Sequence, residues 1–358
     1  MKKIVTVVGA RPQFIKVAPV SRVLRKQYHE IIVNTGQHYD ANMADVFFQQ
    51  LDIPLPDYNL GVGSATHGKQ TGQMLQMIES VLIDEKPEAV LVYGDTNSTL
   101  AGALAASKMH IPIIHVEAGL RSFNKKMPEE VNRVMTDHIS TLLFAPTDTA
   151  VSNLSKEGIV NGVYQVGDVM YDAMIYNIEL AQQRYCIEDF GLKSKQYYLS
   201  TIHRAENTDN RDLLKNILLA LSNLNVDVIL PLHPRTKVKM NEYGLGNILE
   251  SSNIRVIEPV SYLEMILLEQ QARGIITDSG GVQKEAYFLQ VPCYTLRTET
   301  EWVETVNCGW NQLLHPDTPD LAHAILRECE RPYIPNLFGD GRASEKIVSS
   351  IRTLWRTE

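Results

Sequence analysis

The sequence predicts an α/β protein made of two doubly wound domains with a cleft between them. Short, almost wholly apolar runs alternate with helix-length segments, which is typical of parallel sheets covered by helices on both faces. This alternation restarts after residue 190. With 358 residues the chain is long enough for two domains of ordinary size. We therefore expect both domains to be Rossmann-like.

The first half of the chain supplies the first sheet. We expect helices at 66–85, 97–109 and 131–139, because these segments are long and carry apolar residues at helical spacing. The strands are expected where the short apolar runs lie, at 4–8, 31–35, 89–93, 113–117, 142–145 and 163–166. Residues 1–168 therefore form the first predicted domain.

The second half repeats the pattern. A connecting helix at 169–184 and a loop at 191–195 are expected to link the domains, so the linker is 169–195 and the second domain 196–342. Its strands are expected at 197–202, 226–232, 254–257, 274–277 and 293–296.

Composition limits the possible functions. The net charge of −8 argues against nonspecific binding of nucleic acid. The early apolar run at 4–8 is too short for a signal peptide or a membrane span. Four cysteines without a C-x-x-C pair, and ten histidines without H-E-x-x-H, give no metal motif and fit a reducing compartment. We expect a cytoplasmic protein with no metal and no membrane partner.

Candidate functional residues follow the predicted strands. Ligands of doubly wound sheets bind beyond the carboxyl ends of the strands. If the two edges face each other, they form one site. The residues at these ends are Arg11, Asp95 and Glu117 in the first domain, and His203, Arg204, His233, Arg235 and the turn Ser279-Gly280-Gly281 in the second.

The Ser-Gly-Gly turn has the features of an anion site. It joins a predicted strand to a helix start, where unpaired N–H groups and the helix dipole favour negative charge. Two glycines allow close approach of an anion, and Ser279 adds a hydroxyl. Glu285, one turn further, is suited to a sugar diol. The features suggest a nucleoside diphosphate, although an ordinary strand–helix turn has the same glycines.

Three carboxylates are candidates for acid/base work. Asp95 and Glu117 end strands, and Glu129 follows Pro128 at a helix start, where capping is its simpler role. Three carboxylates around one cleft raise each other's pKa and favour proton transfer. His203 suits a second acid/base or phosphate donor, although such a histidine is often structural, and His115 is expected in the core. Arg11 is either a phosphate ligand or a surface cation.

Several segments together resemble the non-hydrolysing UDP-N-acetylglucosamine 2-epimerase family along nearly the whole chain. The resemblance implies a fold of the two-domain glycosyltransferase-B type and a homodimer. It also implies that the second domain holds the nucleotide and that a C-terminal helix, 343–358, crosses back to the first domain. The segments are residues 8–12, 35–38, 94–96, 115–121, 128–133 and 278–281.

The resemblance implies a reaction as well. UDP leaves across C1–C2 of the sugar and returns to a 2-acetamidoglucal, which interconverts UDP-GlcNAc and UDP-ManNAc without a cofactor. Asp95, Glu117 and Glu129 are the implied acid/base set, and His203 assists the leaving UDP. The implied substrate and UDP ligands are Arg11, Arg204, His233, Arg235, Ser279, Gly280, Gly281, Glu285 and Arg297.

Two departures from the family leave alternatives open. Trp302-Val303 stand where an Arg-Pro pair is usual, which is closer to the branch that acts on a UDP-2,3-diacetamido uronic acid. Arg297 and Lys125 or Lys126 are candidate partners for the carboxylate of that sugar. Ala205 replaces the second arginine of an H-R-R-E segment, at the family's activator pocket. A glycosyltransferase of the same fold is a further alternative.

Overall fold

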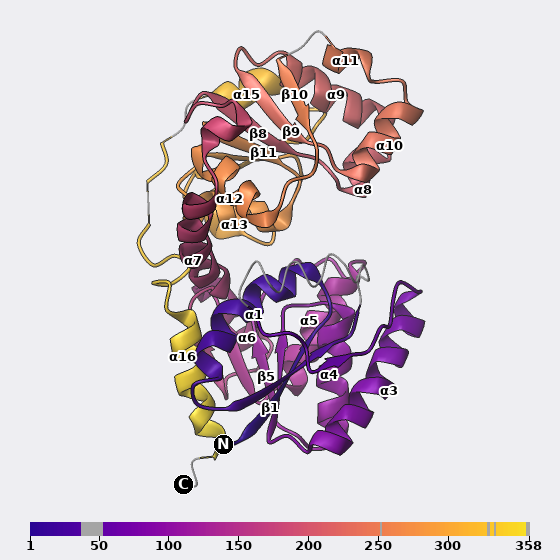
Figure 1. Cartoon of the computed structure of the whole chain (residues 1–358), viewed down its shortest axis with the longest axis vertical. Helices are drawn as coiled ribbons and strands as arrows, with labels where there is room; N and C mark the ends of the chain where they lie inside the picture. The colour runs from indigo at the N-terminus through magenta and orange to yellow at the C-terminus, as the bar shows by residue number, and fades with distance from the viewer. Residues whose placement is uncertain (37–52, 251–252, 328–329, 333, 356–358) are drawn as a thin grey trace. The chain divides into compact units, whose positions relative to one another are not determined.

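The computed structural model describes residues 1–36, 53–250, 253–327, 330–332 and 334–355, apart from the side chains of Arg11 and Glu250. The chain forms two compact units (Figure 1). The first unit contains Met1–Ala173 and Pro335–Glu358, and the second contains Met174–Ile334. The boundary lies within α7 (Val169–Arg184).

A seven-stranded parallel sheet forms the first unit. In β1, every residue after Lys3 is buried, because helices cover both faces of the sheet. Strand order reverses between β1 and β4, which are neighbours in the sheet. The order is β3 (Tyr58–Asn59), β2 (His29–Asn34), β1 (Lys3–Val8), β4 (Ala89–Tyr93), β5 (Ile113–Val116), β6 (Leu142–Ala145) and β7 (Val163–Gln165).

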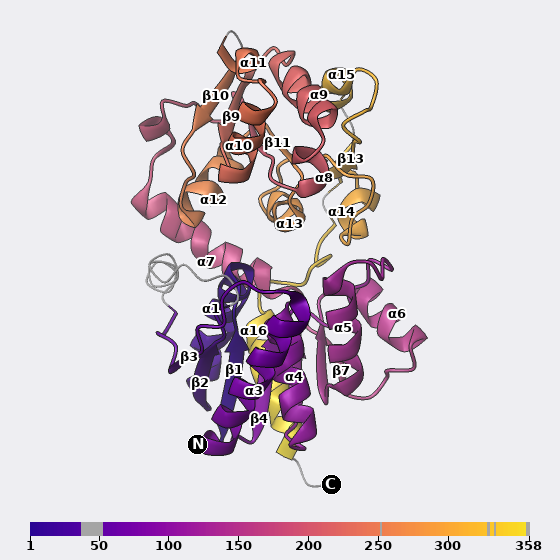
Figure 2. The ribbon, with the colours of Figure 1, turned by 90° about the vertical axis from the view of Figure 1, so that its right-hand side faces the viewer.

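The helices of the first unit divide between the two faces. One core cluster joins Met74 and Ile78 of α3, and small alanines of α4, to Val7 and Val92 of the sheet; α3 and α4 lie side by side (Figure 2). The C-terminal helix α16 packs on α1. The helices are α1 (Arg11–Leu24), α3 (His67–Glu85), α4 (Asn97–Lys108), α5 (Pro128–Ile139), α6 (Asp148–Lys156), α16 (Ala343–Ile351) and the 3₁₀ turn η2 (Arg352–Trp355).

The second unit has its own six-stranded parallel sheet, whose order reverses between β8 and β11. The order is β10 (Ile254–Ile257), β9 (Asp227–Pro231), β8 (Tyr197–Thr201), β11 (Gly274–Thr277), β12 (Cys293–Thr295) and β13 (Asn311–Leu313). Its helices are η1 (Ile187–Phe190), α8 (Ala205–Thr208), α9 (Arg211–Ser222), α10 (Pro234–Glu242), α11 (Asn247–Glu250), α12 (Tyr262–Gln271), α13 (Gly280–Phe288), α14 (Val303–Asn307) and α15 (Leu321–Leu326).

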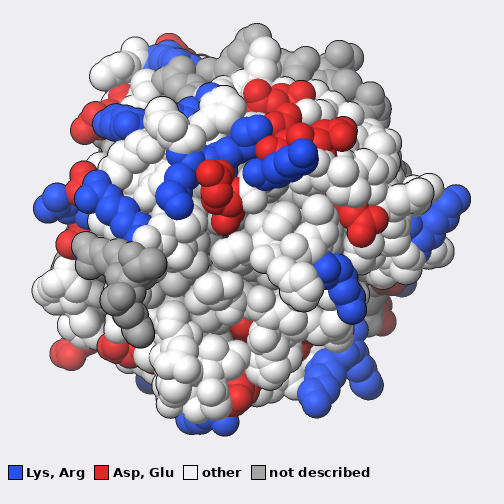
Figure 3. All heavy atoms as spheres, turned by 90° about the horizontal axis from the view of Figure 1, so that it is seen from below, with Lys and Arg blue, Asp and Glu red and all other residues white. Residues whose placement is uncertain are grey.

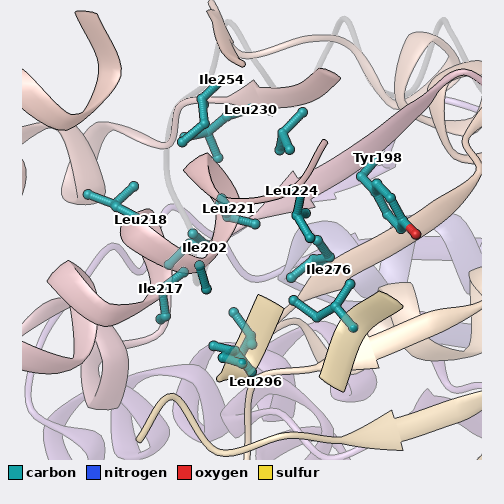
Figure 4. Packing of buried hydrophobic residues seen from close by; sticks show 14 of the residues in the cluster. Tyr198, Ile202, Ile217, Leu218, Leu221, Leu224, Leu230, Ile254, Ile276 and Leu296 are labelled. Carbon is teal, nitrogen blue, oxygen red and sulfur yellow. The ribbon is translucent and has the colours of Figure 1, made fainter. Parts of the chain in front are cut away.

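Alternate strand residues build two cores in the second unit. Tyr198 and Ile276 face α9, where Leu218 and Leu221 complete the cluster drawn in Figure 4. Their strand neighbours face the opposite side: Leu199 and Ile275 pack with Leu268 of α12 and Ala286 of α13. Since a strand turns successive side chains to opposite faces, both faces of this sheet are apolar.

The predicted fold class is confirmed: both units are α/β with parallel sheets. The sequence did not predict β3 and β13, which are only two and three residues long. Positive and negative side chains are intermingled on the face shown in Figure 3. Among the described residues, no helix combines the length and apolar composition needed to cross a membrane.

Candidate active site

The strand order gathers the predicted residues at two places, one in each unit. In a doubly wound sheet, a crevice opens where the strand order reverses, beyond the carboxyl ends of the two central strands. In the first unit these strands are β1 and β4, followed by Gly9 and Gly94; in the second they are β8 and β11, followed by Ile202 and Asp278. We consider each place by itself.

The turn after β1 is tightly closed. The Gln13 side chain accepts hydrogen bonds from the N–H groups of Gly9 (2.9 Å) and Ala10 (3.1 Å) and donates to the carbonyl of Tyr93 (2.9 Å). A Cβ on Gly9 would lie 2.0 Å from the Thr35 hydroxyl oxygen. These two N–H groups are therefore occupied by protein. The side chain of Arg11, the predicted phosphate ligand at this turn, lies outside the described part of the structure.

Glu117 follows β5 in an unusual conformation. Its φ is +71°, a left-handed value that costs energy for a residue with a side chain. The carboxylate forms an ion pair with Lys16 of α1. A Cβ on Gly94 would approach both the Glu117 carboxylate (3.1 Å) and the Lys16 ammonium (3.3 Å). The acid at the end of β5 and the turn at the end of β4 are thus in contact.

A buried network holds this segment in place. Asp137 accepts a hydrogen bond from the Gly119 N–H (3.1 Å), lies 2.7 Å from His115 Nδ1 and pairs with Arg121 at 2.7 Å. Arg121 also pairs with Glu157 through two hydrogen bonds of 2.7 Å. Burial opposes ionisation, but His115 and Arg121 outweigh it and lower the pKa of Asp137. His115 is fully buried, so the prediction of a core histidine is confirmed.

Asp95 is held from α5. Its carboxylate pairs with Arg133, and its carbonyl accepts a hydrogen bond from the Asn132 side chain at 2.9 Å. Glu130 is buried and accepts from the backbone N–H groups of Ser122 and Phe123, both at 2.9 Å. Glu129, the third predicted acid, is exposed in the first turn of α5. Its neighbour Glu130 therefore anchors the preceding loop, while Glu129 faces solvent.

Two histidines and one buried aspartate mark the crevice of the second unit. The His203 ring, 39% exposed, has its Nδ1 3.3 Å from the Asp278 carboxylate. The rings of His203 and His233 have centroids 5.6 Å apart. Burial, and then the neighbouring His203, lower the pKa of His233. His233 Nδ1 accepts a hydrogen bond from the Arg235 N–H and so caps α10.

The Ser-Gly-Gly turn is open at Gly281, whereas a Cβ at Gly280 would lie 2.5 Å from a Glu301 carboxylate oxygen. Ser279 is the N-cap of α13, and Gly281 is exposed in the helix's first turn. A Cβ at Gly281 would meet only the Ser279 hydroxyl, at 4.0 Å. One turn along, Glu285 is buried and accepts a hydrogen bond from the Tyr262 hydroxyl at 3.2 Å. An anion can therefore reach this helix N-terminus.

The predicted arginines of the second unit have different surroundings. Arg235 pairs with Asp209 and donates to the Thr208 hydroxyl at 3.0 Å, so it fastens α10 to α8. Arg297 pairs with Glu301 at 3.2 Å, and this carboxylate lies against Gly280. Arg204 and Arg297 line a pocket of about 130 Å³ together with His315. Arg204 and Arg297 therefore share a pocket, which Glu206 and Glu299 also line, whereas Arg235 contacts Thr208 and Asp209.

Comparison with known proteins shows which family the chain resembles. The family model described as UDP-N-acetylglucosamine 2-epimerase matches residues 22–352. A UDP-N-acetylglucosamine 2-epimerase homolog from Methanococcus maripaludis is 54% identical over 98% of this chain and its own full length. A UDP-2,3-diacetamido-2,3-dideoxy-D-glucuronate 2-epimerase from Pseudomonas aeruginosa is 48% identical, covering 98% of this chain and all of the relative.

A solved structure is similar in fold as well. The Methanocaldococcus jannaschii UDP-GlcNAc 2-epimerase, determined in complex with UDP-GlcNAc and UDP, is 45% identical, with a TM-score of 0.87 over 99% of this chain and 100% of the other. The chain belongs to the UDP-N-acetylglucosamine 2-epimerase family. The family resemblance inferred from the sequence motifs is confirmed, and with it the two-domain fold.

The departure from the family pattern at Trp302 has a structural explanation. Trp302 is 4% exposed, and the ammonium of buried Lys284 lies 3.8 Å from the centre of its ring. Its backbone N–H donates to the Thr300 hydroxyl, which in turn donates to the Gln283 side-chain oxygen of α13. One face of the ring therefore fastens the 297–302 loop to α13.

Sequence reasoning missed several residues that hold the epimerase-family site together. Lys16 and Arg133 pair with the two strand-end acids, Gln13 closes the first turn, and Asp278 holds His203. The motif residues Arg133 and Asp278 were recognised as family features, but their partners were not. Among the described residues, no group of three or more histidine, cysteine, aspartate or glutamate side chains could hold a metal ion.

Proposed function

We propose that this chain is a non-hydrolysing UDP-sugar 2-epimerase that interconverts UDP-GlcNAc and UDP-ManNAc. The observation that carries the proposal is the pairing of strand-end carboxylates with cations: Glu117 with Lys16, and Asp95 with Arg133. Each pair fixes a carboxylate at the carboxyl edge of the sheet, where ligands of doubly wound sheets bind. The family membership and the UDP-GlcNAc-bound relative support the same substrate class.

The reaction proceeds by elimination and re-addition. No carbonyl adjoins sugar C2, so removing its proton alone would leave an unstabilised carbanion. Instead, a carboxylate accepts the C2 proton while the C1–O bond breaks and its electron pair leaves with UDP, which forms a C1=C2 double bond. For the return, an acid protonates the opposite face of C2 as UDP oxygen re-forms its bond to C1. Acid and base groups of this kind contribute about 10² to 10⁴ to rate.

Roles follow for each unit. Asp95, Glu117 and Glu129 of the first unit form the acid/base set, with Arg11 on phosphate. The second unit holds the nucleotide: the α13 N-terminus at Ser279, Gly280 and Gly281 receives the pyrophosphate, where N–H groups stabilise departing charge. Glu285 receives the ribose diol. The remaining phosphate and sugar contacts are assigned to His203, Arg204, His233, Arg235 and Arg297.

A second candidate substrate is a UDP-2,3-diacetamido uronic acid. It is favoured by the 48% identity to a relative named for that activity and by the Trp302-Val303 pair that replaces Arg-Pro. The pocket lined by Arg204 and Arg297 offers cations for the extra carboxylate. Arg297 is already paired with Glu301, so the carboxylate of the substrate has to compete with Glu301 for this arginine.

Assembly and location are part of the proposal. We infer a homodimer, which the family resemblance implies, and a cytoplasmic location, which the four cysteines without a C-x-x-C pair fit. Light scattering behind a sizing column tests the dimer: a mass of one chain at micromolar concentration contradicts it.

The deciding experiment uses UDP-sugars alone in heavy water. Each of the two candidate substrates is incubated at equal concentration with the protein, and NMR follows the C2 epimer and its deuterium. We expect epimer with deuterium at C2 and slow leakage of glycal and UDP. Epimer without solvent hydrogen at C2 contradicts elimination, and transfer only when a sugar acceptor is added identifies a glycosyltransferase. The substrate with the larger kcat/KM is the natural one of the pair.

A further inference from the structure

Asp278 occupies the central position of the second unit's crevice. It directly follows β11, beside β8, the two strands between which the sheet order reverses. Its side chain is fully buried, although it belongs to neither apolar core. The cost of burying a carboxylate is offset only when hydrogen bonds and charges surround it. The partners of Asp278 therefore indicate what it is for.

Each of those partners comes from the segment that follows β8. Asp278 accepts hydrogen bonds from the backbone N–H of His203 (3.1 Å to each oxygen), the backbone N–H of Arg204 (3.0 Å) and the side-chain amide of Asn207 (3.1 Å). The same residue directly precedes Ser279, the N-cap of α13. One carboxylate thus joins the turn that carries His203 to the turn that receives the pyrophosphate.

The His203 ring is held as well as its backbone. Its Nδ1 lies 3.3 Å from an Asp278 oxygen. A carboxylate this close to Nδ1 favours a proton on that nitrogen. His203 Nε2 is then the atom left for a ligand. Asp278 thus contacts both the backbone of the His203 turn and the ring.

We propose that Asp278 is a positioning residue for the departure and return of UDP, acting through His203 without touching the substrate. It fixes the His203 ring with Nδ1 protonated and Nε2 toward the leaving phosphate, and it locks the His203 turn to the Ser279 turn. This inference rests on the proposed epimerase function, in which His203 serves the leaving UDP. In this role, Asp278 itself neither makes nor breaks a bond in the reaction.

A set of variants separates this role from simple structural support. Asp278→Asn keeps size and one acceptor oxygen but loses the charge. Lost partners of a site residue typically cost about 10- to 100-fold in function, so we expect kcat to fall by about tenfold or more, with KM changed less than about threefold. In a His203→Ala background, the same substitution is expected to lower kcat by less than about twofold further, because coupled residues are non-additive.

Asn207→Ala is the matched control. It removes another hydrogen bond from the same carboxylate, and one to the Leu296 carbonyl (3.1 Å), but leaves the pair between His203 and Asp278. We expect this variant to keep kcat within about threefold, even if its melting temperature falls by several degrees. A loss of kcat equal to that of Asp278→Asn, or full additivity with His203→Ala, overturns the proposal.

A measurement on the unaltered protein keeps the test valid if Asp278→Asn fails to fold. Long-range ¹H–¹⁵N spectra of histidine-labelled protein, assigned with His203→Ala, report which ring nitrogen carries the proton. We expect Nδ1 of His203 to be protonated; a neutral ring with its proton on Nε2 overturns the proposal. Failure of the epimerase function is recognised separately, because the unaltered protein then forms no C2 epimer from either UDP-sugar.

Discussion

Both glycine turns lie where the strand order of a sheet reverses, but they follow different strands, β1 and β11, and differ in the space around them. At Gly9, a Cβ would lie 2.0 Å from the Thr35 hydroxyl and 2.2 Å from the Ser98 hydroxyl, and Gln13 occupies the turn's N–H groups. At Gly281, a Cβ would meet only the Ser279 hydroxyl, at 4.0 Å. Position 9 requires glycine because side-chain atoms of Thr35 and Ser98 fill the space that a Cβ would take. Gly281, by contrast, leaves its backbone accessible to a ligand.

This difference divides the chemistry between the two units. A turn with its backbone closed can offer a ligand only side chains, and the first unit places Glu117, Asp95 and Lys16 at that edge. A turn with an open backbone at a helix N-terminus can offer N–H groups and the helix dipole. In the function that we propose, similar sheets therefore serve proton transfer in one unit and anion binding in the other.

The strongest test of the closed turn is Gly9→Ala. The added methyl group overlaps two buried hydroxyl side chains, so we expect the free energy of unfolding to fall by about 3 kcal/mol or more, measured by urea denaturation. Gly72→Ala in α3 is the control, because a Cβ there meets nothing within 4 Å and alanine favours helix by about 1 kcal/mol. A stable, fully active Gly9→Ala variant contradicts the description of this turn as closed.

Removing the charges at the same edge tests the side-chain chemistry. Glu117→Gln, Asp95→Asn and Glu129→Gln are each expected to lower turnover by about a hundredfold or more while the protein stays folded. Initial rates of epimer formation provide the measurement, with UDP affinity as the check on the second unit. Glu129→Gln is the most stringent of the three tests, since Glu129 is exposed in the first turn of α5. Near-normal turnover in Glu129→Gln removes it from the acid/base set.

The sequence predicted which residues follow the strands at the carboxyl edges of the sheets, because this placement depends on topology. Asp95, Glu117 and His203 each follow an apolar strand, and parallel strands bring such ends to one edge. The partners of these residues could not be predicted. Lys16 pairs with an acid 101 residues away, and the distance along the chain carries no sign of it.

The backbone conformation of Glu117 and the packing of Trp302 could not be predicted from the sequence either. The sequence placed Glu117 at the end of a strand, whereas β5 ends at Val116 and Glu117 is left-handed. That conformation depends on the buried network of His115, Asp137 and Arg121, which no local pattern encodes. The sequence showed only that Trp302-Val303 replace an Arg-Pro pair, and the contact of Trp302 with Lys284 is a property of the fold.

Glu269 lies on α12, which packs beside α13, and it destabilises the folded chain by an amount that depends on pH. It is fully buried, and neither oxygen accepts a hydrogen bond from the described residues. Burial, and then the charge of Glu285, raise the pKa of Glu269 well above its ordinary value of 4.5. The folded chain therefore keeps a proton that the unfolded chain releases above about pH 4.5. Stability is lost as pH rises, by up to about 1.4 kcal/mol per pH unit.

Glu269→Met removes that cost with a side chain of similar length. We expect the free energy of unfolding to rise by about 1 to 3 kcal/mol at pH 7, with a larger gain at pH 8 than at pH 5, followed by urea denaturation at each pH. Glu264→Gln is the control, since Glu264 lies on the same helix and accepts from the Ser261 N–H at 2.8 Å. Equal gains at both pH values mean that Glu269 is not protonated in the folded chain.

Gly281→Ala is the gentlest substitution and isolates the open turn. The methyl group enters space that meets only the Ser279 hydroxyl, so the melting temperature without ligand should not fall. The same methyl group stands where a phosphate oxygen must approach the backbone, and we expect UDP affinity to drop by about tenfold, or about 1.4 kcal/mol. Calorimetric titration with UDP measures it, and the rise in melting temperature at a fixed UDP concentration should shrink accordingly. Unchanged UDP affinity, with the fold intact, means that the nucleotide does not use this helix N-terminus, and the division of chemistry between the two units has to be abandoned.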